Sequence, residues 1–243
     1  MILSCVNSKG GVGKTTLSLA LAEHLGLAGR RVLLIDADPQ ASASDRCRRI
    51  SLSHELPYDL DASTEHDHLI EEADERGEDF DEGAIEAAAA TQIEKRIGRT
   101  MRKAANYDHV ILDGPPAAGR LQQALIRASD FVLVPVTPDA MSARAAKRLV
   151  RGIRSAAQAG KDLEAAMVLN RADTRQTATR LAPQVTAQHG LALLTTQIPN
   201  AASSNSADLY STLMSEMGSG SKAFMAAIAE MVANQAPAAT AAS

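Results

Sequence analysis

Short apolar runs alternate with longer segments of helical spacing along most of this chain of 243 residues. The runs are nearly unbroken, which is typical of strands that are buried on both faces of a sheet. The expected strands are Met1 to Asn7, Arg31 to Ile35, His109 to Leu112, Phe131 to Val136, Ala165 to Leu169 and Leu191 to Leu194. The expected helices are Leu17 to Leu27, Ala84 to Ala105, Leu121 to Ala128, Met141 to Gln158, Ala178 to Gln188, Ser206 to Ser215 and Lys222 to Ala233. This alternation predicts an α/β fold of three layers, a mostly parallel twisted sheet with helices on both faces.

The length of the chain fits one large domain, which we expect over residues 1–233. Residues 234–243 are mostly Ala, Pro, Thr and Ser, so we expect a disordered tail there. Aromatic residues make up only 2% of the chain, which disfavours the binding of bases by stacking. The two cysteines, Cys5 and Cys47, lack metal-ligand spacing and indicate a reducing compartment. We find neither a signal peptide nor an apolar stretch approaching 18 residues, and we therefore expect a cytoplasmic protein that does not bind membranes.

An acidic insert at residues 51–83 interrupts the alternation of strands and helices. Residues 54–83 contain 13 Asp or Glu and one Arg, which leaves 16 acidic and 24 basic residues in the rest of the chain. The insert fits no regular element well, and we expect a surface excursion. His66 and His68 stand beside Asp67, but a hydrated acidic loop is favoured over a metal site. A contact surface for a basic partner and a surface that repels DNA both remain open.

The segment from Lys9 to Thr16 reads Lys-Gly-Gly-Val-Gly-Lys-Thr-Thr and lies between an expected strand and an expected helix. This is the context of a Walker A phosphate-binding loop. The glycines let backbone N–H groups turn inward, where they cradle phosphate together with the helix N-terminus. We expect Lys14 to reach the β- and γ-phosphates and the Thr15 hydroxyl to bind Mg²⁺. The expected nucleotide-binding residues of the loop are Lys9, Gly10, Gly11, Val12, Gly13, Lys14, Thr15 and Thr16. The alternative, a glycine turn that binds nothing, is disfavoured because both flanks fit a phosphate site.

Two further expected strands end in carboxylates. The second strand runs into Asp36-Ala-Asp38-Pro-Gln, and the carboxyl end of a parallel strand is where α/β proteins bind ligands. We expect Asp38 to orient the attacking water and Asp36 to support Mg²⁺; the alternative for Asp36 is that it caps the following turn. The third strand ends in Asp113, which fits the Walker B pattern. We expect this carboxylate to hold a Mg²⁺-bound water and Asp113 to be one of the nucleotide-binding residues. Gly114 can bring its N–H close to the γ-phosphate.

The loop departs from the general Walker A pattern, because Ser8 stands where the pattern has Gly and an extra lysine, Lys9, lies at the mouth of the loop. In this respect it resembles the deviant Walker A motif of the ParA/MinD family of P-loop NTPases. The Asp-Ala-Asp-Pro-Gln run matches the second motif of ParA-type proteins. The resemblance covers Met1 to about Val232 and is weaker in the acidic insert and in the last forty residues. The chain starts directly at the first strand, so it looks like the short ParA type without an N-terminal DNA-binding domain.

The resemblance implies a slow ATPase with ATP and Mg²⁺ as cofactors and with Lys9, Lys14 and Asp38 as catalytic residues. In the family, the extra lysine crosses a dimer interface to the partner's nucleotide. The chain is therefore expected to form a homodimer with ATP and to bind double-stranded DNA without sequence preference in that state. A ParB-type adaptor would stimulate hydrolysis and release the DNA. The implied function is partition of plasmid or chromosomal DNA on the nucleoid of a bacterium.

By the same resemblance, Asn170 would read the adenine edge, with Arg171, Pro199 and Asn200 close to the base. An Asn amide offers both a donor and an acceptor, which suits adenine. The alternative for Asn170 is a turn residue at the end of a strand.

Basic residues recur at helical spacing in the second half of the chain. The expected DNA-binding residues are Arg144, Lys147, Arg148, Arg151, Arg154 and Arg175. The first five span an arc of roughly 120° on one expected helix. With no aromatic residues between them, we expect salt-sensitive contact with phosphates rather than recognition of bases. An ordinary solvated face remains the alternative.

The same kind of loop occurs in other classes of protein. A membrane-binding MinD-type protein needs a C-terminal amphipathic helix with basic residues, whereas residues 224–243 contain Glu230 and no Lys or Arg. A nitrogenase-like reductase needs cluster-ligating cysteines, and neither cysteine follows a strand end near Asp113. A dethiobiotin synthetase needs a substrate pocket that the sequence does not reveal. A relative that positions a protein assembly instead of DNA remains open.

Overall fold

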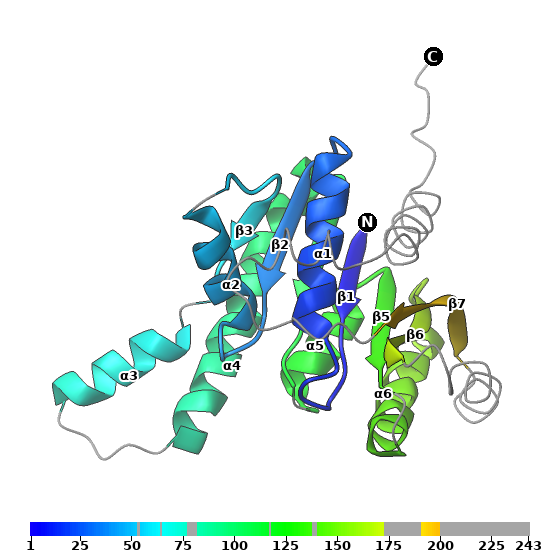
Figure 1. Ribbon diagram of the computed structural model, residues 1–243. Coiled ribbons are helices and arrows are strands. Elements are labelled where there is room, and N and C mark those ends of the chain that lie inside the picture. Colours follow the sequence, from blue (N-terminus) through cyan, green and yellow to red (C-terminus); the bar gives the residue numbers. More distant parts are fainter. Residues whose placement is uncertain are drawn as a thin grey trace.

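One parallel sheet organises the molecule (Figure 1). The computed structural model describes residues 1–52, 54–63, 65–76, 82–116, 118–137, 140–172 and 191–199. Their strands are β1 (Ile2–Cys5), β2 (Val32–Asp36), β3 (Asp59–Asp61), β4 (His109–Asp113), β5 (Phe131–Val136), β6 (Glu164–Ala172) and β7 (Ala192–Pro199). They lie in the order β3-β2-β4-β1-β5-β6-β7, and each neighbouring pair is parallel. The predicted α/β class is confirmed.

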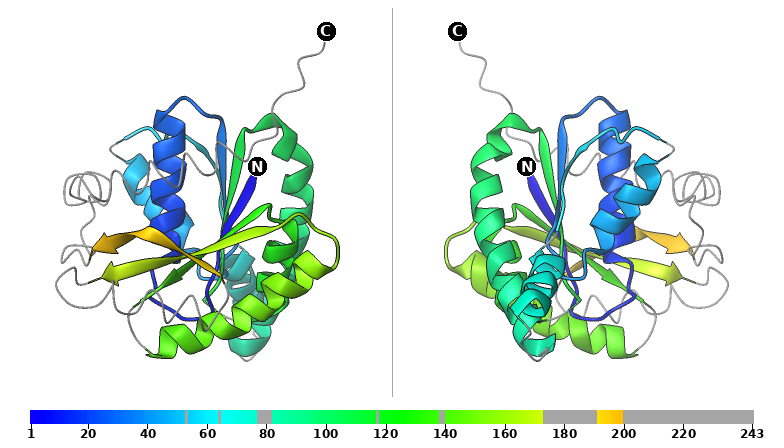
Figure 2. Two further views of the ribbon diagram at one scale, coloured as in Figure 1. Left: turned by 90° about the vertical axis from the view of Figure 1, so that its right-hand side faces the viewer. Right: turned by 90° about the vertical axis from the view of Figure 1, so that its left-hand side faces the viewer.

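Helices cover both faces of this sheet (Figure 2). The helices are α1 (Lys14–Leu27), α2 (Ser42–Ser51), α3 (Glu65–Arg76), α4 (Glu82–Thr100), α5 (Arg120–Ala128) and α6 (Ala140–Gln158), and a 3₁₀ helix (Met101–Asn106) follows α4. Side chains of α1 and α2 pack on one face, and side chains of α4, α5 and α6 pack on the other. Strand β2 shows how the sequence serves both cores: Leu34 belongs to the first, whereas Leu33 and Ile35 belong to the second. Alternate residues of a strand point to opposite faces of the sheet. Because both faces are buried here, the residues of β2 that face either core must be apolar.

The acidic insert is more regular than the sequence analysis expected. Asp59–Asp61 forms β3, which pairs in parallel with β2 at the edge of the sheet, and Glu65–Arg76 forms α3, which packs beside α4. The expectation that residues 51–83 fit no regular element is therefore wrong for these two segments. The strand has only one inward apolar residue, Leu60, and the helix is anchored by buried polar residues, Ser63 and Glu65. Neither segment gives the apolar periodicity on which the prediction depended.

Other element boundaries differ less. Helix α2 was not predicted, because its sequence is mostly polar and only Ala43, Ser44 and Cys47 are buried. Strand β7 continues to Pro199, five residues beyond the expected Leu194. Several expected segments lie outside the described residues: the helices at 178–188, 206–215 and 222–233 and the tail at 234–243. The side chains of His66 and Asp67 lie outside them as well. Within the described ranges, none of the helices combines the length and the apolar character that crossing a bilayer requires.

Candidate functional site

The order of the strands brings the predicted motifs together at the carboxyl ends of neighbouring inner strands of the sheet. Strands β2, β4 and β1 are neighbours, and their registers pair Asp113 with Asp36 on one side and with Cys5 on the other. The loop from Lys9 to Thr16 follows β1 and leads directly into α1. The three segments that the sequence analysis selected therefore meet where ligands bind in parallel α/β sheets.

The backbone of the phosphate-binding loop needs glycine at two positions. Gly11 has φ 71° and Gly13 has φ 95°, in the left-handed region that other residues seldom adopt. Gly13 is also the residue that precedes α1. The loop thus ends at a helix N-terminus whose free N–H groups favour an anion.

Lys14 folds back into this loop. Its side chain is buried, and Nζ donates to the main-chain oxygen of Lys9 at 3.4 Å. Burial lowers the pKa of Lys14, and the carboxylates of Asp113 and Asp38 oppose that change. A buried ammonium group with a single carbonyl partner in the described residues is suited to an anion that enters the loop.

The loop is also held by the segment that follows β1. Lys9 donates its backbone N–H to Asn7 Oδ1 at 3.0 Å, and Asn7 Nδ2 donates to the carbonyl of Pro135 on β5 at 2.7 Å. Asn7, which follows β1, therefore ties the start of the loop to β5. The expected reach of the Lys9 side chain into a partner's site stays a prediction.

Asp113 is completely buried at the end of β4. Its Oδ1 accepts a hydrogen bond from Ser18 Oγ at 2.8 Å, and its side chain also bonds to that of Thr15. Its Oδ2 is buried and has no hydrogen-bond partner among the described residues. Burial, with the nearby charge of Asp36, raises the pKa of Asp113 to about 7. A buried carboxylate oxygen without a partner, beside a threonine hydroxyl, is a donor set that fits Mg²⁺.

Asp36 has a structural task that the alternative interpretation anticipated. Its Oδ1 accepts the backbone N–H of Asp38 at 3.0 Å, and its Oδ2 accepts the N–H and the hydroxyl of Ser44 at 2.8 and 2.7 Å. Asp36 thus fixes the turn that leads into α2, as the capping alternative proposed. Its support of Mg²⁺ stays a prediction. Asp38 lies in this turn, largely buried, and its Oδ1 accepts the N–H of Gln40 at 3.0 Å.

One expectation about the end of β4 is wrong. The N–H of Gly114 donates to the carbonyl of Cys5 at 3.1 Å, so it is not directed at a phosphate. A Cβ at this position would lie 2.9 Å from that carbonyl oxygen. Glycine is therefore required here for the close approach of β4 to β1.

Asn170 reaches the phosphate-binding loop from β6. Its Nδ2 donates to the carbonyl of Val12 at 2.8 Å, and a Cβ at Gly13 would lie 2.1 Å from the same nitrogen. The alternative of a turn residue is wrong, since Asn170 lies inside β6 and is buried. Contact with adenine stays a prediction. Arg171 is in β6 and Pro199 ends β7, but their side chains, like Asn200, lie outside the described residues.

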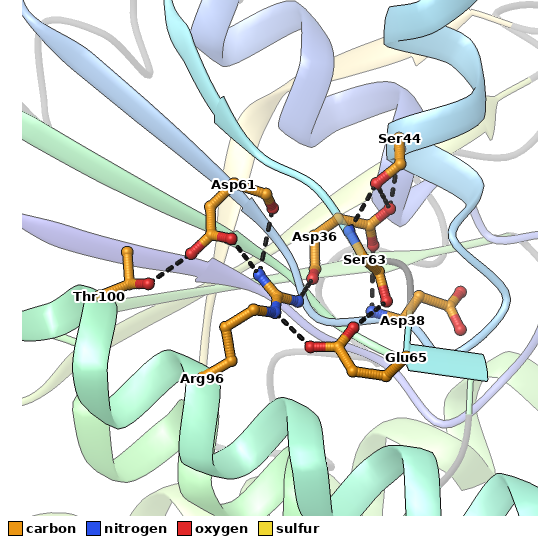
Figure 3. Close-up of polar contacts among 8 residues, drawn as sticks. All are labelled: Asp36, Asp38, Ser44, Asp61, Ser63, Glu65, Arg96 and Thr100. Carbon is orange, nitrogen blue, oxygen red and sulfur yellow. Dashed lines mark hydrogen bonds and ion pairs between the residues drawn. The ribbon is translucent and has the colours of Figure 1, made fainter. Parts of the chain in front are cut away.

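Two arginines near the site were missed by the sequence analysis. Arg96 of α4 donates to Glu65 Oε1 at 2.5 Å, to Asp61 Oδ1 at 2.6 Å and to the carbonyl of Asp36 at 2.5 Å (Figure 3). Arg46 of α2 donates from Nη1 to Thr16 Oγ1 at 3.0 Å. Neither has a local signal in the sequence, because each contact joins segments at least 30 residues apart.

A second feature lies away from the loop, between α5 and α6. It is a groove of about 650 Å³ whose lining includes four basic side chains, Arg127, Arg148, Arg151 and Lys161, and no acidic one among the residues that the structure describes. Arg148 and Arg151 were predicted as DNA-binding residues, whereas Arg127 and Lys161 were not in that set. Arg154 is exposed on the same helix. The side chains of Arg144 and Lys147, and all of Arg175, lie outside the described residues.

Comparison with known proteins gives matches that include this site. A family model described as an AAA domain matches residues 1–165. The sporulation initiation inhibitor protein Soj of Bacillus subtilis is 33% identical over 170 residues, with 63% of this chain and 64% of Soj covered. The maintenance of carboxysome distribution protein A of Halothiobacillus neapolitanus is 28% identical over 202 residues, with 81% of this chain and 78% of that protein covered. The match to Soj thus spans less than two thirds of that protein.

Solved structures share the fold. The cobyrinic acid a,c-diamide synthase of Mycobacterium smegmatis, solved with a bound ATP analogue and magnesium, gives a TM-score of 0.61 at 28% sequence identity. The similarity covers 90% of this chain and 96% of that one.

Proposed function

Because this chain belongs to the ParA/MinD family of P-loop ATPases, we propose that it is a slow ATPase that dimerises with ATP and partitions DNA. In the ATP-bound dimer it binds double-stranded DNA without sequence preference, and a ParB-type adaptor releases it by stimulating hydrolysis. It acts on the nucleoid in a bacterial cytoplasm. The observation that carries the proposal is the meeting of three motifs, the Lys9–Thr16 loop, Asp36–Gln40 and Asp113, at one edge of the sheet.

The loop and its neighbours supply the nucleotide site of this proposal. Backbone N–H groups of the loop and the α1 N-terminus bind the phosphates, with the Lys14 ammonium beside them. Thr15 and Asp113 are the residues that would hold Mg²⁺, whose charge offsets that of the phosphates. The buried Oδ2 of Asp113, which has no partner in the described part of the chain, supports this assignment.

Asp38 is the residue that would orient the attacking water. Support comes from its position in the turn held by Asp36 and from its burial, since an ordered carboxylate is needed for positioning. Lys9 would lend its charge to the nucleotide of a second copy. Dimerisation would then be coupled to the triphosphate, and hydrolysis would act as a timer.

The basic groove between α5 and α6 supports DNA binding. Arg148 and Arg151 come from one helix and Arg127 from the other, so two elements present positive charge to the same space. In the described part of the lining these guanidinium groups have no acidic neighbour. Guanidinium groups suit phosphate oxygens. Contacts of this kind carry no sequence information and weaken with salt.

A second candidate function keeps the ATPase and changes the cargo. The similarity to the carboxysome distribution protein extends over 81% of this chain, more than the match to Soj covers. A ParA-type ATPase that positions a protein assembly would also use an ATP dimer on DNA. The two functions differ in the adaptor and in what it is attached to.

The test combines ATPase assays with and without non-specific double-stranded DNA and gel filtration with ATP and with ADP. We expect a dimer with ATP and Mg²⁺, a monomer with ADP, and turnover that responds to DNA. A protein that stays monomeric at saturating ATP and Mg²⁺ would overturn the proposal. Co-purification of a DNA-binding adaptor favours partition, whereas co-purification of an adaptor bound to a protein shell favours the second candidate.

A further inference from the structure

A positive charge from outside the phosphate-binding loop lies against its last residue. Arg46 is on α2, and its Nη1 donates to the hydroxyl of Thr16 at 3.0 Å. Thr16 is on the first turn of α1 and closes the Lys9–Thr16 loop. The side chain of Arg46 is half-buried. The guanidinium group is thus held at the edge of the predicted phosphate site by a helix that follows a different strand.

This guanidinium group has no ion-pair partner among the described residues, although burial lowers its pKa and only the charge of Asp113, beyond ion-pair distance, opposes that change. Among the described residues, the hydroxyl of Thr16 is its hydrogen-bond acceptor, and no carboxylate lies within ion-pair distance of it. Arg48, two residues further along α2, shows the contrast, since it pairs with Asp45 at 3.2 Å. A guanidinium group has five N–H donors, and one neutral acceptor leaves most of them available. Removal of such a charge from water is unfavourable unless an anion compensates it.

The position of Arg46 is fixed by the rest of the site. Ser44, two residues earlier, donates its N–H and its hydroxyl to Asp36. Cys47, the next residue, is buried against the α1 side of the sheet and lies 3.5 Å from the Tyr58 hydroxyl. Helix α2 therefore cannot turn without breaking contacts on both sides of Arg46. A charge that is placed in advance loses less entropy when it binds a ligand.

The nearest anion that the site is built to accept is a nucleotide. In loops of this type, the backbone N–H groups hold the α- and β-phosphates, whereas the loop lysine reaches the β- and γ-phosphates. Thr16 follows Thr15 on the helix that points at these phosphates. We propose that Arg46 binds the diphosphate portion common to ATP and ADP, as a ligand that α2 supplies within the same subunit. This inference rests on nucleotide binding at the loop, which is part of the function proposed above.

The proposal changes the charge inventory of the site. From the sequence alone, positive charge at the phosphates is expected only from Lys14 and from Lys9 of a second copy. With Arg46, a single subunit presents two cations, Lys14 and Arg46, before any dimer forms. The affinity of the monomer for ADP should then depend on Arg46. A contact at the γ-phosphate or across a dimer interface would not produce this dependence.

The test is titration of the full-length chain with ATP and with ADP in the presence of Mg²⁺, by calorimetry, for wild type and Arg46→Gln. We expect both nucleotides to bind about tenfold more weakly to Arg46→Gln, the effect of one charge-assisted hydrogen bond. Arg48→Gln is the matched control on the same helix, and we expect its affinity to stay within about twofold of wild type. Thermal melting without nucleotide checks that the variants are folded.

Arg46→Lys is a second variant that retains the charge and loses the planar fork. We expect it to bind both nucleotides with an affinity between those of wild type and Arg46→Gln, and it keeps the test valid if Arg46→Gln does not fold. Wild-type affinity in the folded variants overturns the proposal, whatever happens to turnover. Weakening of ATP binding alone also overturns it, since the contact would then be at the γ-phosphate. A wild-type protein that binds nucleotide but neither dimerises nor binds DNA would refute the proposed function and leave this test unaffected.

Discussion

Arg96 donates a hydrogen bond from Nη2 to the main-chain carbonyl of Asp36 at 2.5 Å, which joins α4 to the strand end that carries the acidic motif. The same guanidinium group pairs with Asp61 of β3 and Glu65 of α3. Ser63 continues the contact, because its N–H donates to the hydroxyl of Ser44, which in turn donates to Asp36. Residues of the acidic insert therefore help to hold Asp36 and the strand end at the candidate site in place (Figure 3).

The first prediction concerns this cluster. We expect Arg96→Met to lower the free energy of unfolding by about 3–5 kcal/mol, because it leaves two largely buried carboxylates without their cation. Urea denaturation measures the change. Arg99→Met, at an exposed position of the same helix, should change the free energy by less than about 0.5 kcal/mol. Equal losses in the two variants would mean that the cluster adds no stability of its own.

The second prediction concerns hydrolysis. Asp38→Ala should bind ATP and reduce turnover by about 10² to 10⁴-fold, since a positioned proton acceptor contributes about that much. An ATP-bound dimer should then accumulate, which gel filtration detects. The control is Asp45→Ala on the exposed side of α2, for which we expect wild-type turnover. If Asp38→Ala also turns over like wild type, Asp38 has no role in the chemical step.

The third prediction concerns the basic groove. Arg127→Glu combined with Arg148→Glu should weaken the binding of non-specific DNA and leave ATP-dependent dimerisation intact. Each lost phosphate contact should make the negative slope of log affinity against log salt shallower by about 0.9. The exposed pair Arg30→Glu and Arg102→Glu makes the same change in net charge outside the groove. Equal DNA affinity for the two double variants would show that only net charge matters.

The fourth prediction concerns acid stability. Burial lowers the pKa of His109 at the start of β4, and repulsion from the N-terminal amino group adds to this. Just below about pH 6.5, the unfolded chain therefore binds a proton that the folded chain does not, so the free energy of unfolding falls as the pH drops. One proton contributes at most about 1.4 kcal/mol per pH unit.

His109→Gln should flatten the dependence on pH between about 6.5 and the lowered pKa of the folded state. Urea denaturation at a series of pH values measures it, and His24→Gln on α1 is the control. An unchanged slope in His109→Gln would assign the acid sensitivity to other groups. Only the slope is compared, so a constant loss of stability in the variant does not affect the test.

The sequence predicted those parts of the site that lie next to a strand end. The Lys9–Thr16 loop, Asp36, Asp38 and Asp113 follow apolar runs directly, and parallel strands bring their carboxyl ends to one edge. The parallel sheet itself followed from the alternation of elements. These features depend on neighbours in the sequence and could be inferred without coordinates.

The arginines could not be found in this way. Arg46 is 30 residues from Thr16, and Arg96 is 60 residues from Asp36, so their partners are set by how helices dock on the sheet. In the sequence each is one basic residue among several on a polar helix. Strand β3 was missed for a related reason, since three residues at an edge carry too little pattern to be recognised.

The hydrogen bond from Asn170 to Val12 crosses 158 positions of the chain. The family model ends at residue 165, before this side chain. A shortened protein that stopped there would keep every motif by which the family is recognised. It would nevertheless leave the carbonyl of Val12 without its amide donor from Asn170, so the part of the chain that bears the motifs lacks one of the contacts that hold its own phosphate-binding loop.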